Sequence, residues 1–282
     1  MSVFFTENKL SDYEQTPLYG LNDEYDKLLK FCQLVWSNDW GHKKELYKFN
    51  PTIMLYGSPG TGKTTLLKNV SLCLQCDDFK YFSLSLELLL DKDLGKSSQQ
   101  LKSFFEQVEG SSENGEKVFL HFDDVDAVLC SRYISNESSG VKRLVNTFIK
   151  EIDRIQSKKY KFTPIITTTT NMFSLIDTAV KRRFSIKLHI ENNINVEDFK
   201  CWLKPIFSDL KIVGDIDYVK LHEIVNEKSL TAYDVCLVMQ NILLEKLVGV
   251  NIDQKFVEAS FKISDSSKLD FEEHKSKLSA LK

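Results

Sequence analysis

The sequence predicts an α/β fold, with a parallel sheet covered by helices on both faces and a smaller helical domain after it. Five short β-like runs alternate with helical patterns, and the strand signal stops at about residue 193. Alternation of this kind is typical of parallel sheets whose crossover connections are helices. The expected strands lie at 51–56, 79–85, 117–123, 162–170 and 185–190.

Helical patterns continue after the strand signal ends. Thr231 and Asp234 have the spacing of a capping box at the start of one of them. The polar segment 264–282 predicts a solvated helix or a frayed tail. The expected C-terminal helices lie at 196–207, 219–227 and 232–248. Segments rich in Gly, Ser and Asn predict loops at 92–98, 110–116 and 135–140. We therefore predict two domains, at 1–192 and 193–282.

Composition narrows the class of protein. The chain has 282 residues, 42% of them hydrophobic and 27% charged, which is ordinary for a globular protein. Its net charge of −3 gives no general attraction to nucleic acid or to an anionic membrane, and the sequence shows no basic patch interleaved with aromatic residues. No apolar run approaches the roughly 20 residues of a membrane span, and we recognise no signal peptide. We expect an intracellular, cytoplasmic or nuclear protein.

Residues 57–64 form a complete phosphate-binding motif between an apolar run and a helical pattern. Glycines let backbone amides approach phosphate oxygens, and the start of a helix adds partial positive charge. Lys63 is placed to neutralise the β- and γ-phosphates, and the Thr64 hydroxyl to bind Mg²⁺. The residues predicted to bind the nucleotide are Gly57, Ser58, Pro59, Gly60, Thr61, Gly62, Lys63, Thr64 and Thr65. The motif predicts binding of a nucleoside triphosphate.

Three further signals follow along the chain. The apolar run 118–122 leads into Asp123 and Asp124, which suits a Mg²⁺-holding carboxylate followed by one that polarises water. A later strand ends at Asn171, whose amide is suited to orient a water near the γ-phosphate. Arg182 and Arg183 precede the last expected strand, from where they are suited to stabilise charge in a neighbouring subunit's nucleotide site.

Together these motifs resemble the AAA (AAA+) ATPases, in particular the clade of katanin, spastin and the ESCRT-disassembly ATPase. Gly20 and Leu21 are similar to the family's opening segment that packs against adenine, and Asn171 to its sensor 1. Residues 231–235 resemble the start of its lid helix. The other matching segments are 57–64 (Walker A), 119–128 (Walker B), 143–153, and 175–184 with the arginine fingers. The resemblance covers residues 19–248.

The resemblance implies ATP and Mg²⁺ as cofactors and a hexameric ring or partial spiral. ATP would lie at each subunit interface, and its hydrolysis would remodel or disassemble a protein complex. It assigns metal binding to Thr64 and Asp123, and catalytic roles to a second set of residues. That set is Lys63, Asp124, Asn171, Arg182 and Arg183. The implied partners are further copies of the chain or a related ATPase subunit, with a protein substrate or adaptor and no nucleic acid.

Two positions depart from the family's pattern. Asp124 stands where the family has Glu, and the missing methylene shortens the reach by an amount that can cost on the order of 100-fold in rate. Asp93 replaces the aromatic residue of the pore segment. These departures keep open a nucleotide-binding scaffold, or a subunit of low activity beside a second ATPase. A DNA-related loader is a further alternative, disfavoured by the acidic balance. Among remodelling proteins, the ATPases that act on HORMA proteins are one option.

Overall fold

The computed structural model describes residues 6–7, 14–89, 96–129, 139–191, 194–212 and 215–280. The chain divides into two compact units, each built from more than one segment. The first unit comprises residues 1–16, 24–57 and 63–189, and the second comprises 17–23, 58–62 and 190–282. Within the described residues, no helix combines the length and the apolar character needed to cross a membrane.

A six-stranded sheet with the order β1-β3-β4-β5-β2-β6 forms the centre of the first unit. Five neighbouring strands pair in parallel, as the alternation of strands and helices predicts. Among the strands of the described residues, β1 alone is antiparallel; it is a two-residue edge strand on β3 that sequence patterning did not predict. The strands are β1 Thr6–Glu7, β2 Thr52–Tyr56, β3 Phe79–Ser85, β4 Lys117–Asp123, β5 Ile165–Thr170 and β6 Ile186–His189.

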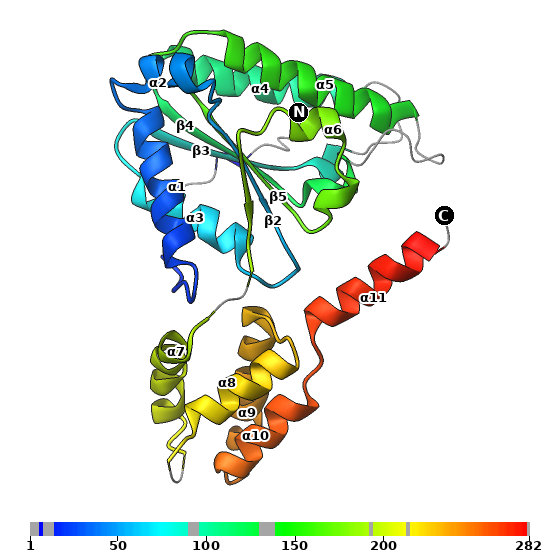
Figure 1. Ribbon diagram of the computed structural model, residues 1–282. Coiled ribbons are helices and arrows are strands. Elements are labelled where there is room, and N and C mark those ends of the chain that lie inside the picture. The colour runs from blue at the N-terminus through cyan, green and yellow to red at the C-terminus, as the bar shows by residue number, and fades with distance from the viewer. Residues whose placement is uncertain are drawn as a thin grey trace. The chain divides into compact units, whose positions relative to one another are not determined.

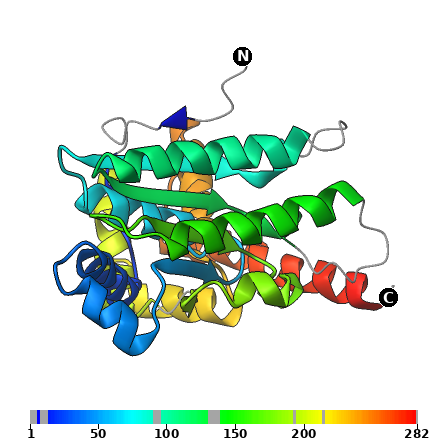
Figure 2. The same cartoon turned by 90° about the horizontal axis from the view of Figure 1, so that it is seen from above.

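Helices cover both faces of this sheet. The long helices α4 and α5 lie side by side over one face, and α3 lies on the other (Figures 1 and 2). Under α4 and α5 the core is aromatic: Phe122 of β4 packs edge to face on Phe148 of α5, with ring centroids 5.0 Å apart. The helices are α1 Asn22–Val35, α2 Trp40–Tyr47, α3 Lys63–Cys73, α4 Lys96–Glu113, α5 Ser139–Ser157 and α6 Thr178–Lys181. Short 3₁₀ turns occupy Leu86–Leu89, Val125–Ala127 and Phe173–Leu175.

One local expectation about this unit is wrong. The loop expected at 110–116 is mostly helix, because α4 continues to Glu113. Gly110 sits there with open space around its Cα, and the buried hydroxyl of Ser112 bonds to the carbonyl of Val108 inside the helix. Helix α2 was not predicted. The expected loops 92–98 and 135–140 lie largely outside the described residues.

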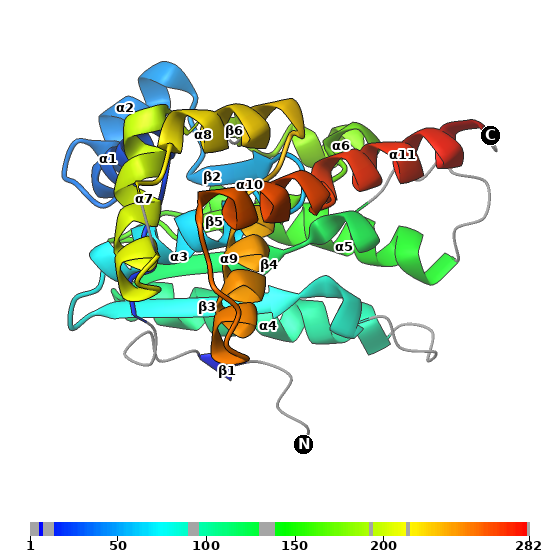
Figure 3. The same cartoon turned by 90° about the horizontal axis from the view of Figure 1, so that it is seen from below.

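The second unit is helical in its C-terminal segment, as the sequence predicts (Figure 3). Asn195, Asp217, Thr231 and Asp253 each cap a helix by accepting a backbone N–H of its first turn. The capping box of Thr231 and Asp234 is confirmed. The helices are α7 Val196–Asp209, α8 Tyr218–Glu227, α9 Ala232–Leu247, α10 Gln254–Ile263 and α11 Ser267–Ala280. Helix α11 falls in the segment expected to be a solvated helix or a tail.

Candidate functional site

The loop between β2 and α3 has the backbone of a phosphate-binding loop. Gly60 and Gly62 have φ angles of +75° and +86°, a region that favours glycine because it has no side chain to clash with the backbone. The hydroxyl of Thr61 donates to the carbonyl of Ser58 at 3.0 Å and tightens the turn. Lys63 then opens α3. The geometry presents backbone amides at a helix N-terminus, where an anion is favoured.

Gly60 also makes a close approach within the second unit. Its carbonyl accepts the backbone N–H of Tyr233 at 3.3 Å. A Cβ at this position would stand 2.6 Å from the hydroxyl oxygen of Thr231 and 2.8 Å from the Cβ of Tyr233. The close contact with the start of α9 therefore leaves no room for a side chain at position 60. This is a second reason for glycine there, independent of its φ angle.

Lys63 is buried and held by the loop that precedes it. Its side chain is 6% exposed, and Nζ donates to the carbonyl of Gly57 at 3.0 Å. Burial lowers the pKa of Lys63 to about 8, an effect that the nearby charges of Asp124, Asp126 and Asp123 partly offset. An anionic ligand would stabilise the charged form of this buried ammonium group.

Thr64 and Asp123 are joined directly. The Thr64 hydroxyl donates to Oδ1 of Asp123 at 2.9 Å, and the Thr169 hydroxyl donates to the same oxygen at 2.5 Å. Nε2 of His121 lies 3.5 Å from this oxygen and makes no hydrogen bond to it. Burial works against the charged carboxylate, but these three neighbours outweigh it and hold the pKa of Asp123 well below its usual range.

Asp124 has an unusual backbone for a residue with a side chain. Its φ and ψ angles are 43° and 54°, in the left-handed region that Asp and Asn tolerate better than other side chains do. Its backbone N–H donates to the Thr169 hydroxyl at 3.1 Å, and its Oδ1 accepts from the amide of Asn171 at 3.3 Å. Burial, followed by the charges of Asp123 and Asp126, raises the pKa of Asp124. A carboxylate with a raised pKa is better matched to accepting a proton.

The sheet explains why these residues meet. Strands β4 and β5 are parallel neighbours, so their carboxyl ends reach the same edge of the sheet. The end of β5 is held to the end of β4 by a 3.1 Å hydrogen bond from the backbone N–H of Asn171 to Asp126. Strand β2, which leads into the phosphate loop, is the next strand along. Five of the residues singled out from the sequence thus gather in the first unit, namely Lys63, Thr64, Asp123, Asp124 and Asn171.

The two arginines differ in their surroundings. Arg183 makes a two-pronged ion pair with Asp153, with Nε and NH2 at 3.1 and 2.9 Å from the carboxylate oxygens, and its NH1 donates to the carbonyl of Ala179. Arg182 is exposed, and in the described part of the chain no acceptor lies within reach of its guanidinium group. Arg182 is therefore the one of the two whose charge is available to another molecule.

The remaining predicted residues are placed as follows. Gly20 has a φ of +71° and packs on Ile194, while Leu21 is 4% exposed, both in the second unit. Thr65 lies in the first turn of α3. Asp93 of the expected pore segment lies outside the described residues.

The donor set fits Mg²⁺ with a nucleotide. A Thr hydroxyl and a carboxylate that stays ionised are hard oxygen ligands, as Mg²⁺ prefers. Among the described residues there is no group of three or more His, Cys, Asp and Glu that would cage a metal without a substrate. Thr64 and Asp123 would therefore hold the ion together with phosphate oxygens, the usual arrangement for Mg²⁺.

Sequence reasoning missed the residues behind Asp123. Thr169 serves both Asp123 and Asp124, and Thr167 contacts Nδ1 of His121 at 3.0 Å. His121 is buried at 1% exposure, and its Nε2 lies 3.5 Å from Asp123. The four threonines at the end of β5 were a visible signal, since polar residues in a fully buried strand need partners.

A glycine loop between strand β2 and its helix, with acids at the end of β4 two places along the same parallel sheet, is typical of P-loop ATPase folds. Residues 53–192, just under half of the chain, match the model described as "ATPase family associated with various cellular activities (AAA)", so this segment is of the AAA family. The family resemblance drawn from the motifs is therefore confirmed at this level, as is the expected fold class.

Several curated relatives share part of the chain. A Corynebacterium jeikeium protein named "AAA ATPase forming ring-shaped complexes" is 30% identical over 141 residues, which is 49% of this chain and 27% of the relative. A Micrococcus luteus protein of the same name is 26% identical, over 70% of this chain and 34% of the relative. The "Pachytene checkpoint protein 2 homolog" of Arabidopsis thaliana is 29% identical, over 53% and 34%. The chain thus spans about a third or less of these relatives' length.

One solved structure covers nearly the whole chain. A chain of the E. coli MS115-1 HORMA:CdnC:Trip13 complex superposes with a TM-score of 0.73, covering 88% of this chain and 90% of its own length. At 21% sequence identity this likeness shows the fold.

Proposed function

We propose that this protein binds Mg·ATP, assembles into a ring and uses ATP hydrolysis to remodel a protein complex. The single observation that carries the proposal is the convergence of Lys63, Thr64, Asp123, Asp124 and Asn171 at the carboxyl ends of β2, β4 and β5. Relatives named for ring-shaped complexes support the assembly. We take the ring to be a hexamer, with a nucleotide-binding domain at 1–192 and a helical lid at 193–282.

Each residue has a role that its position favours. The loop amides and Lys63 bind the phosphates, and Mg²⁺ held through Thr64 and Asp123 would supply further neutralisation of their charge. Asp124 accepts the proton of the attacking water, because burial and the charges of Asp123 and Asp126 raise the pKa of its carboxyl group. Asn171 donates to that carboxylate at 3.3 Å and fixes its orientation.

Arg182 completes the site from the neighbouring subunit. Arg183 is paired with Asp153, whereas the guanidinium group of Arg182 has no ion-pair partner among the described residues, so we assign the trans-acting role to Arg182. We assign to Arg183 the task of holding α6 against α5. An arginine that stabilises the transition state in this way contributes about 10³- to 10⁵-fold in rate.

The partner is best sought among HORMA-type protein complexes. The matched structure is a HORMA:CdnC:Trip13 complex, and one relative is named for the pachytene checkpoint protein 2. None of the relatives described above carries a katanin, spastin or ESCRT name, so the comparisons give that narrower expectation no support. We therefore prefer a remodelling role of the Trip13 kind over membrane-complex disassembly.

The test is steady-state phosphate release by the wild type and by Lys63→Ala, with Lys68→Ala as a matched control on the same helix. We expect Mg-dependent turnover by the wild type and the control, and none by Lys63→Ala. Equal background rates in all three proteins contradict the proposal. Asp124→Asn with ATP present should then retain a partner protein, which mass spectrometry identifies.

A nucleotide-binding scaffold is the second candidate, and the short side chain of Asp124 favours it. In that case ATP binds tightly and drives assembly while turnover stays near background. Calorimetry with ATP and light scattering with and without nucleotide separate the two functions, since only the scaffold assembles without releasing phosphate.

A further inference from the structure

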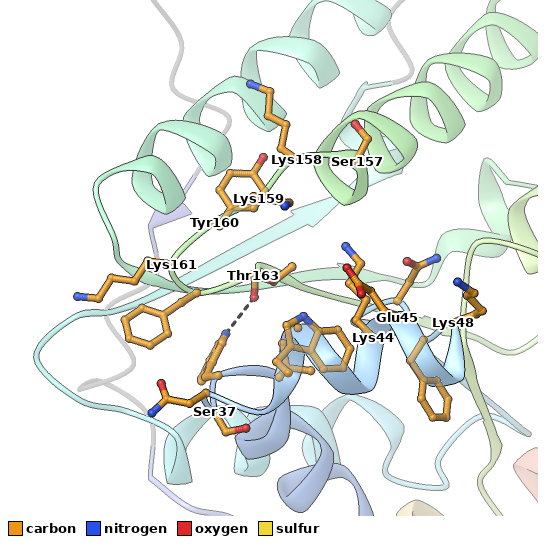
Figure 4. Close-up of a pocket in the computed structure, with 18 residues that line it drawn as sticks. Ser37, Lys44, Glu45, Lys48, Ser157, Lys158, Lys159, Tyr160, Lys161 and Thr163 are labelled. Carbon is orange, nitrogen blue, oxygen red and sulfur yellow. Dashed lines mark hydrogen bonds between the residues drawn. The ribbon is translucent and has the colours of Figure 1, made fainter.

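A cavity of about 860 Å³ lies in the first unit, away from the residues described above. It is lined by the end of α1, by α2 with the residues that follow it, and by the segment 157–163 ahead of β5 (Figure 4). These segments adjoin the amino ends of β2 and β5, whereas the proposed ATP site uses the carboxyl ends of β2, β4 and β5. The cavity thus lies at the amino ends of the strands, opposite the end that holds the proposed ATP site. Its volume is in the range of small-molecule sites.

The charge of the cavity opposes that of the whole chain. Five lysines and one glutamate, Glu45, line it in a protein with a net charge of −3. Lys158 is neutralised by ion pairs with Glu109 and Glu113. The other four lysines have no carboxylate within ion-pair distance among the described residues; they are Lys44, Lys48, Lys159 and Lys161. Figure 4 shows these four on the two opposite sides of the cavity. A ligand carrying several negative charges meets complementary charge from both sides.

The cavity also has an aromatic lining, including Trp36, Trp40 and Phe49. The indole N–H of Trp36 donates to the carbonyl of Thr163 at 3.0 Å, the dashed line in Figure 4. Trp40 is 5% exposed, yet no acceptor for its indole N–H is present in the described structure. A buried donor without a partner is unfavourable, so an oxygen atom of a ligand that accepts this N–H is favoured there. Phe49 is 37% exposed, which leaves ring surface available for stacking.

We propose that this cavity binds a nucleotide, as the free molecule or as the end of a nucleic acid single strand. Lysines recognise the phosphate as point charges, and aromatic rings stack on a base whatever its sequence. An apolar ligand would bury lysine ammonium groups without a partner, which is unfavourable. An acidic peptide would satisfy the lysines but would have no flat group for the aromatic lining. No continuous stretch of the sequence forms a basic aromatic patch. The fold brings lysines and aromatic rings together from two distant segments, 35–50 and 157–163.

The test uses fluorescence anisotropy with a fluorescein-labelled, 5′-phosphorylated oligothymidylate and the full chain. Lys48→Glu/Lys159→Glu/Lys161→Glu reverses three exposed charges at the cavity. The matched control, Lys27→Glu/Lys102→Glu/Lys150→Glu, makes the same charge change at exposed positions on α1, α4 and α5. We expect at least about tenfold weaker binding for the cavity variant and less than about twofold for the control. The slope of log affinity against log salt should become shallower by about 2, since each lost phosphate contact contributes about 0.7.

Two smaller changes test the aromatic part and remain informative if the triple variant unfolds. Phe49→Ala should weaken binding about tenfold through lost stacking, and Trp40→Phe several-fold through the lost N–H. Competition by thymidine 5′-monophosphate identifies the free nucleotide as the source of the ligand. Binding of the oligonucleotide without such competition identifies the strand end.

The proposal is overturned if the cavity and control variants bind the probe equally, or if only a Glu-rich peptide binds with dependence on these lysines. Lys63→Ala should leave probe binding unchanged, because its loop lies at the other edge of the sheet. Loss of binding in that variant would assign the probe to the ATP site and also overturn the proposal. The measurement needs no hydrolysis, so its failure and that of the proposed ATPase activity are distinguishable.

Discussion

The hydroxyl of Thr64 donates a 2.9 Å hydrogen bond to Oδ1 of Asp123, which ties the first turn of α3 to the end of β4. Both oxygens are hard ligands, so the pair is suited to hold Mg²⁺ beside the phosphates. Thr64→Val keeps the shape of the side chain and removes the ligand oxygen. We expect at least about tenfold more Mg²⁺ for half-maximal phosphate release, with Thr64→Ser close to wild type. Equal Mg²⁺ requirements in all three proteins would contradict this role.

Substitution of the two neighbouring arginines should have different effects on phosphate release and on stability. Arg182→Ala removes a charge without an intramolecular partner in the described structure, so we expect a fall in phosphate release of about 10³-fold or more and an unchanged melting temperature. Arg183→Ala breaks the ion pair with Asp153, which is half exposed and contributes about 0–1 kcal/mol of stability. Asp153→Ala should reproduce that small loss. Thermal unfolding and phosphate release of the three variants check both assignments.

If Arg182 acts across a subunit interface, mixing two inactive variants should restore activity. Arg182→Ala has an intact phosphate loop, and Lys63→Ala has an intact arginine. When the two inactive proteins are mixed, interfaces that combine both intact parts form, and part of the activity should return. Mixtures that stay as inactive as their components place the arginine's function within its own subunit.

Asp124 should be replaceable in two informative ways. Asp124→Asn tolerates the left-handed backbone and removes the base, so we expect phosphate release to fall about 10²- to 10⁴-fold with ATP binding retained. Asp124→Glu restores the missing methylene and should raise the rate, at a backbone cost of about 1 kcal/mol in unfolding free energy. A lower rate in Asp124→Glu would show that the shorter side chain is already well placed.

The sheet was predictable because its strands are strongly patterned. The runs that became β3 and β4 were predicted with the bounds observed, since both are buried and end in turn-forming or acidic residues. The candidate ATP site followed from motif spacing alone. The role of Thr169 did not, because its two hydrogen bonds depend on the register between β4 and β5, which a single sequence does not specify.

Helix α2 shows the limit of periodicity. Its eight residues carry a single buried side chain, Trp40, and therefore show no apolar face for a pattern search to detect. The cavity depends on this helix, and its lysines come from positions more than a hundred residues apart in the chain, such as Lys48 and Lys159. Long-range assembly of this kind is visible only in the fold.

The pKa of Lys63 predicts how ATP binding depends on pH. Burial lowers this pKa from 10.5 to about 8, so the free protein sheds the proton as pH rises through about 8. Triphosphate favours the ammonium form, and binding above that pH must take up a proton. Affinity should therefore be steady below about pH 7.5 and fall by up to about tenfold per pH unit above pH 8.

The same linkage gives the sign for stability. Because the folded pKa lies below the unfolded one, the unfolded chain binds this proton more tightly, and Lys63 destabilises the free fold below about pH 8. The penalty is relieved as pH rises from about 8 to about 10.5. Calorimetry at about pH 8.5 in buffers of different ionisation enthalpy should detect the proton taken up with ATP. Lys63→Arg stays charged and should bind without uptake, so equal uptake in both proteins would exclude Lys63 as the titrating group.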